Sequence, residues 1–265
     1  MRTFQGRVAL VTGGSSGIGR AAALAFAREG AQVVLSARGE ERGQEVVREI
    51  TVAGGAATFV RADMSQASEI EALITRTVDL YGKLDCAFNN AATSEDSIAS
   101  ILDFTESTFD KVIRVNLKSV WLCMKYEIQQ MLKQTNPGGA IVNTSSVNGL
   151  GGSPAGALYS ATKAGVLALT KSAAQEFAAK GIRINALVAG AFRTPMLDGA
   201  MEAMSGGNDE ARKAVESRYV ELIPQRRIGD AGEAAEAALW LCSDAASYVT
   251  GHSMIVDGGL TAWAR

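Results

Sequence analysis

The stretch Val8-Ala9-Leu10-Val11-Thr12-Gly13-Gly14-Ser15-Ser16-Gly17-Ile18-Gly19 places a short apolar run directly before a glycine-rich turn. Residues 17–29 then have the pattern of a helix, which ends at Gly30. An apolar run of this length is typical of a strand that is buried on both faces. This strand–turn–helix unit predicts the start of a doubly wound α/β sheet.

The same alternation of apolar runs and amphipathic segments continues along the chain. Strand-like runs fall at 8–11, 32–35, 57–60, 84–88, 140–144, 182–188 and 253–256. Helix-length segments fall at 17–29, 40–52, 67–81, 107–133, 157–179 and 229–241. This order predicts an α/β fold of the Rossmann type, a doubly wound parallel sheet of about seven strands with helices on both faces in a three-layer sandwich.

Residues 1–265 contain no evident linker or internal repeat, so we expect a single domain. One irregular stretch, 191–225, contains Met196, Met201 and Met204 followed by Gly206-Gly207-Asn208-Asp209. A stretch of this length without a strand is usually a functional loop or lid, and methionines suit a deformable apolar wall. An extra helical hairpin packed on the surface is compatible with the same residues.

The composition excludes several classes of protein. Of the 265 residues, 47% are hydrophobic and 20% are charged, which is not the composition of a disordered chain. Lys and Arg total 26 against 28 Asp and Glu, a net charge of -2, so neither nucleic acid nor an anionic membrane surface is an expected partner.

The cysteines and the chain start favour a cytoplasmic protein. Cys86, Cys123 and Cys242 are odd in number and widely spaced, which argues against a disulfide framework or a metal site. The sequence shows neither a signal-type segment nor a run of ~20 apolar residues. The single histidine, His252, excludes any mechanism that needs two, and we expect it to be structural or exposed.

The glycine turn has the composition of a pyrophosphate-binding site. Gly13, Gly17 and Gly19 are spaced G-x-x-x-G-x-G at the first strand–helix junction. There, backbone N–H groups can approach a phosphate while the helix N-terminus attracts negative charge. A turn that only needs positive φ has similar residues, so its position is what favours a dinucleotide site.

The turn resembles that of the short-chain dehydrogenase/reductase family, and further motifs similar to that family follow in its order. They are Asn89-Asn90-Ala91-Ala92, Asn116, Ser145-Ser146, Tyr159-Ser160-Ala161-Thr162-Lys163 and Val256-Asp257-Gly258-Gly259. The resemblance runs from about Gly6 to Gly259. The chain departs from the family pattern at Ala92, where glycine is usual, and at Ala189, where proline is usual.

Four polar residues are the candidate catalytic group. Tyr159 and Lys163 are four residues apart and share one face of a helix. A tyrosine with its usual pKa of ~10 is a poor base at neutral pH, and a nearby ammonium lowers that pKa. The resemblance implies that Tyr159 is the general acid/base, that Lys163 lowers its pKa and binds the nicotinamide ribose, that Ser146 orients the substrate oxygen, and that Asn116 holds a water of the proton relay.

The resemblance also implies a set of cofactor-binding residues. They are Gly13, Ser15, Ser16, Gly17, Ile18, Gly19, Arg38, Asp63, Met64, Asn90, Tyr159, Lys163, Gly190 and Thr194. Asp63 also fits an N-cap for the helix that follows it. An acidic residue after the second strand binds the ribose of NAD, whereas an arginine accommodates the phosphate of NADP. Because Ala37 and Arg38 stand there, we expect NADP, with NAD as the alternative.

The expected function is an NAD(P)-dependent oxidoreductase that interconverts a secondary alcohol and a ketone by hydride transfer, without a metal. A non-catalytic dinucleotide sensor is one alternative, which the four catalytic residues argue against. A nucleotide-sugar epimerase or dehydratase is another, but little chain is spare after Ala191 for a second substrate domain. Substrate specificity is expected in 94–105 and 191–225.

We also expect a homotetramer, with a dimer as the alternative. The helix at 157–179 carries the small residues Ala161, Ala164, Gly165 and Ala168, which permit close approach of a second helix. The C-terminal run 253–264 ends in apolar side chains, and the family resembled here commonly assembles through such helices and the last strand.

Overall fold

The computed structural model describes residues 3–94 and 98–262, and within them seven parallel strands form one sheet. Its order is β3-β2-β1-β4-β5-β6-β9. The strands are β1 (Val8–Thr12), β2 (Gln32–Ala37), β3 (Ala56–Arg61), β4 (Cys86–Asn89), β5 (Gly139–Ser146), β6 (Ile182–Ala189) and β9 (Ser253–Val256). The prediction of a doubly wound parallel sheet is therefore confirmed, because the order reverses between β1 and β4.

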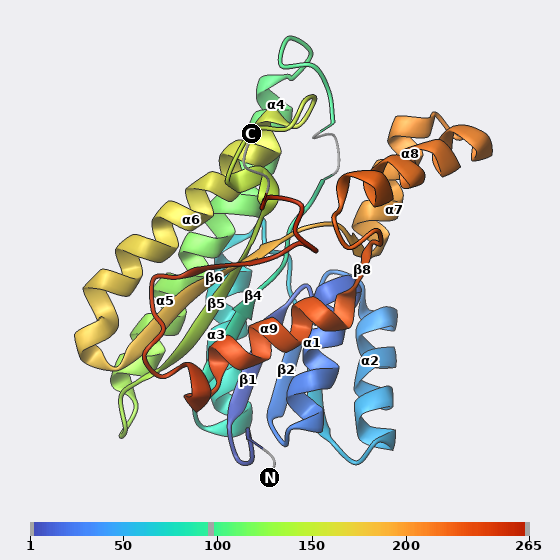
Figure 1. Cartoon of the computed structure of the whole chain (residues 1–265). Coiled ribbons are helices and arrows are strands. Elements are labelled where there is room, and N and C mark those ends of the chain that lie inside the picture. Colours follow the sequence, from blue (N-terminus) through green and yellow to red (C-terminus); the bar gives the residue numbers. More distant parts are fainter. Residues whose placement is uncertain (1–2, 95–97, 263–265) are drawn as a thin grey trace.

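Helices cover both faces of the sheet (Figure 1). One layer holds α1 (Gly17–Arg28), α2 (Glu40–Val52) and α9 (Ala231–Cys242), and its core includes Phe26 and Leu239. The other holds α3 (Ala67–Tyr81), α5 (Ser119–Lys133) and α6 (Ala157–Phe177), with Leu73 and Val166 in its core. The central strands are apolar on both faces because both layers bury them.

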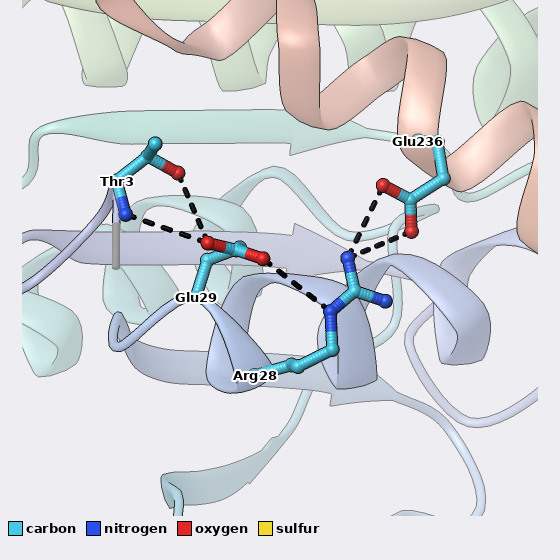
Figure 2. A network of polar contacts seen from close by, with 4 residues as sticks. All are labelled: Thr3, Arg28, Glu29 and Glu236. Atoms are coloured by element: carbon cyan, nitrogen blue, oxygen red, sulfur yellow. Dashed lines mark hydrogen bonds and ion pairs between the residues drawn. The ribbon is translucent and has the colours of Figure 1, made fainter. Parts of the chain in front are cut away.

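A network of polar contacts at the C-terminal end of α1 connects this helix with α9 and with the N-terminal segment (Figure 2). Arg28 donates to both carboxylate oxygens of Glu236 on α9, at 2.8 and 3.2 Å. Glu29 accepts from Arg28 and from the backbone and hydroxyl of Thr3. These exposed pairs contribute little individually, and they join the N-terminal segment to α1 and α9.

The helix expected at 107–133 is not regular along its length. It runs as α4 (Glu106–Ile113), a π-helical turn (Arg114–Lys118) and α5, with Asn116 inside the π turn. A π turn holds one residue more than an α-helical turn, and the spacing of apolar residues in the sequence does not reveal it. π turns of this kind occur frequently at functional sites.

The irregular stretch 191–225 forms a helical hairpin. It contains the short strand β7 (Phe192–Arg193), α7 (Pro195–Ser205) and α8 (Asp209–Leu222), and β7 pairs with β8 (Gly229–Asp230). Thr194 and Asn208 cap the two helices with their side chains. Figure 1 shows α7 and α8 beyond the carboxyl ends of the strands, apart from both helix layers.

Within residues 3–94 and 98–262, every helix is too short or too polar to cross a bilayer.

Candidate active site

The glycine turn after β1 is a tightly packed cradle. Gly13 and Gly17 have φ of 66° and 52°, a region that favours glycine. A Cβ on Gly19 would lie 2.2 Å from the Gly13 carbonyl oxygen, so a larger residue there would push the turn open. Ser16 precedes α1 without a side-chain capping bond, and the first turn of α1 carries no acidic residue. The N–H groups that begin α1 therefore suit a phosphate.

The loop after β4 is joined to this cradle through Thr12. The Thr12 hydroxyl accepts hydrogen bonds from the backbone N–H groups of Asn90 and Ala91, at 3.1 and 3.2 Å. The Asn90 amide nitrogen would lie 3.1 Å from a Cβ on Gly13. Asn90 therefore contacts the glycine turn directly and lines the same cleft.

Arg38, Asp63 and Met64 line the end of the cleft beyond β2 and β3. Arg38 is exposed, and the buried Ser36 hydroxyl beside it has no hydrogen-bond partner among the described residues. Burial raises the pKa of Asp63, but hydrogen bonds from Ser65 and the nearby Arg38 and Arg61 outweigh it and lower the pKa overall. This end is therefore polar and carries a positive group that faces solvent.

Asp63 is not the N-cap of the helix that follows it. Its carboxylate accepts from the N–H of Ser65 at 2.8 Å, whereas α3 begins only at Ala67 with Gln66 as its N-cap. Asp63 thus closes a turn before the helix rather than capping the helix itself.

The candidate catalytic residues converge from β5 and the first turns of α6. Ser146 is the last residue of β5, and the half-buried Tyr159 and buried Lys163 lie on α6. The Lys163 Nζ donates to the Thr144 carbonyl oxygen at 2.9 Å and lies 5.5 Å from the centre of the Tyr159 ring. All three side chains line the cleft.

The pKa values of this group follow burial. Burial raises the pKa of Tyr159 to about 12, and a hydrogen bond with Ser146 opposes the rise. Burial also lowers the pKa of Lys163 to about 8, because the amine has lost water. The expected lowering of the Tyr159 pKa by Lys163 is therefore not seen in the protein alone, where desolvation of the phenolate is the larger effect.

Asn116 lies beneath the cleft and does not line it. Its side chain pairs with the backbone of Thr93, accepting from the N–H and donating to the carbonyl, both at 2.8 Å. The π turn thus holds the loop that follows β4. Gly19 also lies outside the cleft wall, under Gly13 and Asn90.

Gly190 and Thr194 close the cleft beyond β6. A Cβ on Gly190 would lie 2.6 Å from the Cα of Asp257, so the chain after β9 requires glycine here. Thr194, the N-cap of α7, lies against the cradle, since its methyl would be 3.1 Å from a Cβ on Gly17. The start of the hairpin is therefore placed over the glycine turn.

These groups line one continuous cleft of about 1190 Å³, which extends under the α7–α8 hairpin. Its outer wall includes Met196, Leu197 and Met204 from α7 and Tyr219 from α8. Burial raises the pKa of Tyr219. The stretch 191–225 thus forms a helical hairpin that contributes an apolar wall to the cleft.

The other expected specificity segment, 94–105, is described only in part, because residues 95–97 lie outside the described residues. Ile98 lines the cleft, and the N–H of Ala99 donates to the carbonyl of Ala155 at 2.9 Å. Ala155 has a φ of 58°, which is unusual for alanine. The loops before α4 and α6 are therefore joined at the mouth of the cleft.

Sequence reasoning missed some groups of the site. The Thr144 carbonyl, which anchors Lys163, belongs to the backbone, and a sequence pattern does not identify it. Tyr219 and Leu260 line the cleft without a motif. His252 is exposed; its backbone N–H donates to the Asn185 Oδ1, and its carbonyl accepts from the N–H of Ala186.

Comparisons with known proteins agree with this geometry. The family model described as enoyl-(acyl carrier protein) reductase matches residues 13–261. The chain is 39% identical over 262 residues to a 2,5-dichloro-2,5-cyclohexadiene-1,4-diol dehydrogenase of Sphingobium indicum, covering 99% of this chain and 100% of the relative.

Two further similarities extend this finding. The chain is 40% identical over 253 residues to a 3-oxoacyl-[acyl-carrier-protein] reductase of Staphylococcus aureus, covering 95% of this chain and 97% of that protein. The crystal structure of levodione reductase superposes with a TM-score of 0.93 at 36% identity, covering 98% of this chain and 100% of the other.

Proposed function

The chain belongs to the short-chain dehydrogenase/reductase family, and from this premise we propose how its residues perform the reaction. It is an NAD(P)-dependent oxidoreductase that acts on alcohol and ketone groups. The observation that carries the proposal is the convergence of Ser146, Tyr159 and Lys163 in the cleft that also contains the glycine cradle.

The residues of the cradle fit a dinucleotide. Gly13 and Gly17 leave room for a pyrophosphate beside the N-terminus of α1, while Asn90 and Thr194 flank it. When bound, the nicotinamide cofactor accepts or supplies the hydride. Lys163 holds the nicotinamide ribose in this proposal, since its Nζ projects into the cleft from the carbonyl of Thr144.

The proton is handled by Tyr159. With a pKa raised to about 12, its phenol is neutral at neutral pH and suited to donate a proton to a ketone oxygen. Ser146 orients that oxygen, because its hydroxyl lies at the carboxyl end of β5 beside the tyrosine. Asn116 holds a water of the relay in this proposal. Its pairing with Thr93 uses one acceptor position of the side-chain oxygen and one N–H of the side-chain amide, so the second of each can bind the water.

NADP is the preferred cofactor in this proposal. Ala37 ends β2 without a carboxylate, and the exposed Arg38 follows it at the rim of the cleft. The buried Ser36 hydroxyl lacks a partner among the described residues and adds a donor nearby. An arginine binds a phosphate bidentately, and NAD remains the alternative cofactor.

The active form in this proposal is a cytoplasmic homotetramer of single-domain subunits. Ala161, Ala164 and Ala168 form an exposed face of α6, and Trp121 of α5 is exposed as well. Gly165 instead is half-buried and packs against Leu117 of the same subunit. Residues 263–265 of the C-terminal run lie outside the described residues. Three buried free cysteines fit a reducing compartment.

The hairpin α7–α8 serves as the lid over the substrate in this proposal. Its apolar wall favours a substrate with a sizeable hydrocarbon body, and Tyr219 provides a polar contact on that wall.

The proposed reaction is tested with a panel of secondary alcohols and cyclic or acyclic ketones. The absorbance of reduced nicotinamide is followed with NADP(H) and NAD(H) in turn. Turnover of at least one substrate class, lost in Tyr159→Phe, supports the proposal. Turnover that survives in Tyr159→Phe would contradict the assigned roles.

A further inference from the structure

A second group of polar side chains is buried directly beneath the active site. Glu127 of α5 is fully buried, and its Oε2 accepts from the Asn89 amide at 2.9 Å. The same amide nitrogen donates to the Asn143 Oδ1 at 3.0 Å. Asn143 in turn donates to the Thr170 hydroxyl at 3.0 Å and to the sulfur of Met124 at 3.1 Å. The group joins α5, β4, β5 and α6.

The carboxyl group of Glu127 is buried without a compensating positive charge. Within residues 3–94 and 98–262 it makes no ion pair, and its Oε1 has no hydrogen-bond partner. Burial raises the pKa of Glu127 to about 8, and the hydrogen bond from Asn89 reverses this only in part. The titratable group beside it, Cys123 on the same helix, is also buried with a raised pKa and stays a neutral thiol. An uncharged acid is the form that such a site accommodates.

The position of this network connects it with the reaction. Asn89 and Asn143 are register partners on β4 and β5. The residues that follow them are Asn90, which contacts the glycine cradle, and Thr144, whose carbonyl holds Lys163 at 2.9 Å. The Thr144 hydroxyl also reaches Asn90 Oδ1 at 3.5 Å. The separation of the two strand ends therefore sets the distance between the cofactor cradle and Lys163.

We propose that Glu127 is a positioning residue of the active site, held as the neutral acid, which fixes Asn89 against Asn143 and thereby sets Asn90 and Thr144 in place. It touches neither substrate nor cofactor, because it is buried beneath the strands and does not line the cleft. The inference rests on the proposed roles of Lys163 and the glycine cradle. Neither the Tyr159–Lys163 motif nor the glycine turn includes this residue.

Glu127→Gln is the conservative variant. It keeps an oxygen that accepts from Asn89 and replaces the acid hydroxyl by an amide of similar size. Glu127→Leu keeps the volume but removes the acceptor, which leaves the Asn89 amide held by Asn143 alone. Ile128→Ala is the matched control, because Ile128 is the next residue of α5 and is buried, and its truncation destabilises the same helix without touching the network.

The first experiment measures kcat and the cofactor dissociation constant for these variants below their melting temperatures. We expect Glu127→Leu to lower kcat and to weaken cofactor binding by about tenfold or more, since small displacements of catalytic groups are costly. We expect Glu127→Gln to stay within a factor of about three of the wild type, and Ile128→Ala to lose thermal stability while keeping kcat.

The second experiment reads the protonation state directly and does not require turnover. The infrared difference spectrum between wild type and Glu127→Gln at pH 6 is expected to contain the carbonyl stretch of a protonated carboxylic acid. A carboxylate band in its place would overturn the assignment of a neutral acid, even if Glu127→Leu did not fold.

The outcomes separate this inference from the proposed function. Wild-type kcat and cofactor affinity in Glu127→Leu, or an equal loss of kcat in Ile128→Ala, would overturn the positioning role. A loss in Glu127→Gln as large as that in Glu127→Leu would overturn it too. If the wild type turned over no alcohol or ketone, the proposed reaction would fail, while cofactor affinity and the infrared band would still decide the role of Glu127.

Discussion

The ammonium of Lys163 donates a 2.9 Å hydrogen bond to the backbone carbonyl of Thr144, two residues before Ser146 on the same strand. β5 therefore positions both the serine and the lysine, although the lysine belongs to α6. Because this bond consumes one of the three ammonium donors, two remain for the cleft.

Replacing Lys163 by methionine should lower kcat by about 10²-fold or more and raise the KM for the cofactor about tenfold, since charged hydrogen bonds contribute about 1.5–3 kcal/mol. The fold should persist, because burial of the charged amine is itself unfavourable, as its pKa of about 8 indicates, and methionine removes this cost. Steady-state kinetics with varied cofactor check this. Unchanged cofactor KM would contradict the ribose-binding role.

Replacing Tyr159 by phenylalanine should show a different kinetic pattern. The ring is kept and the proton donor is lost, so kcat should fall by about 10²–10⁴-fold while cofactor affinity stays nearly constant. Cofactor binding is measured by fluorescence titration and kcat by absorbance. A variant that kept most of its kcat would show that another group transfers the proton.

Replacing Arg38 by alanine should reduce the preference for NADP over NAD by about one to two decades, as expected for a charge-assisted phosphate contact of about 1.5–3 kcal/mol. The ratio of kcat/KM for the two cofactors is the measurement. Arg42→Ala serves as the comparison, because Arg42 also lines the cleft but lies in the first turn of α2. A wild-type kcat/KM that is equal or better with NAD, and that Arg38→Ala leaves unchanged, would favour NAD as the natural cofactor.

Glu127 should make stability depend on pH. Its pKa of about 8 in the folded protein exceeds the ~4.3 of an unfolded glutamate, so the folded state binds the extra proton between these values. The free energy of unfolding should therefore fall with rising pH, by about 1.4 kcal/mol per unit between roughly pH 5 and 8, relative to Glu127→Gln. Urea titrations of both proteins at pH 5.5 and 7.5 measure the difference. Parallel stability curves would mean that Glu127 titrates normally.

Light scattering should give about four times the subunit mass of 27.7 kDa at micromolar concentration. Ala168→Glu should lower the assembled mass, since Ala168 lies on the exposed face of α6 and a charge there opposes close helix contact. Glu45→Arg, on the exposed side of α2, should leave it unchanged. A single species of 27.7 kDa for the wild type would rule out the assembly.

Much of the architecture is determined by local pattern. The seven strands appear where apolar runs stand, and α1 follows the glycine turn as its composition predicts. These features depend on residues close in the chain, where the periods of strand and helix are expressed directly. The family was recognisable for the same reason, because its motifs are short and ordered.

Other features depend on residues that are far apart in sequence. The π turn around Asn116, the α7–α8 hairpin and the Thr144 carbonyl beside Lys163 have no local signature that distinguishes them. The direction of the Tyr159 pKa also follows from burial, which opposes the effect expected from its spacing to Lys163.

Glu127 shows the division most clearly. In sequence it is one acidic residue of an amphipathic helix, 38 residues from Asn89. Only the register of β4 with β5 and the packing of α5 beneath them bring the two Asn side chains and this carboxyl group together. The spacing of apolar residues in the sequence determined which helices and strands form. Packing between distant residues decided which polar groups are buried and contact one another, because desolvation and hydrogen-bond geometry arise only once the layers are assembled.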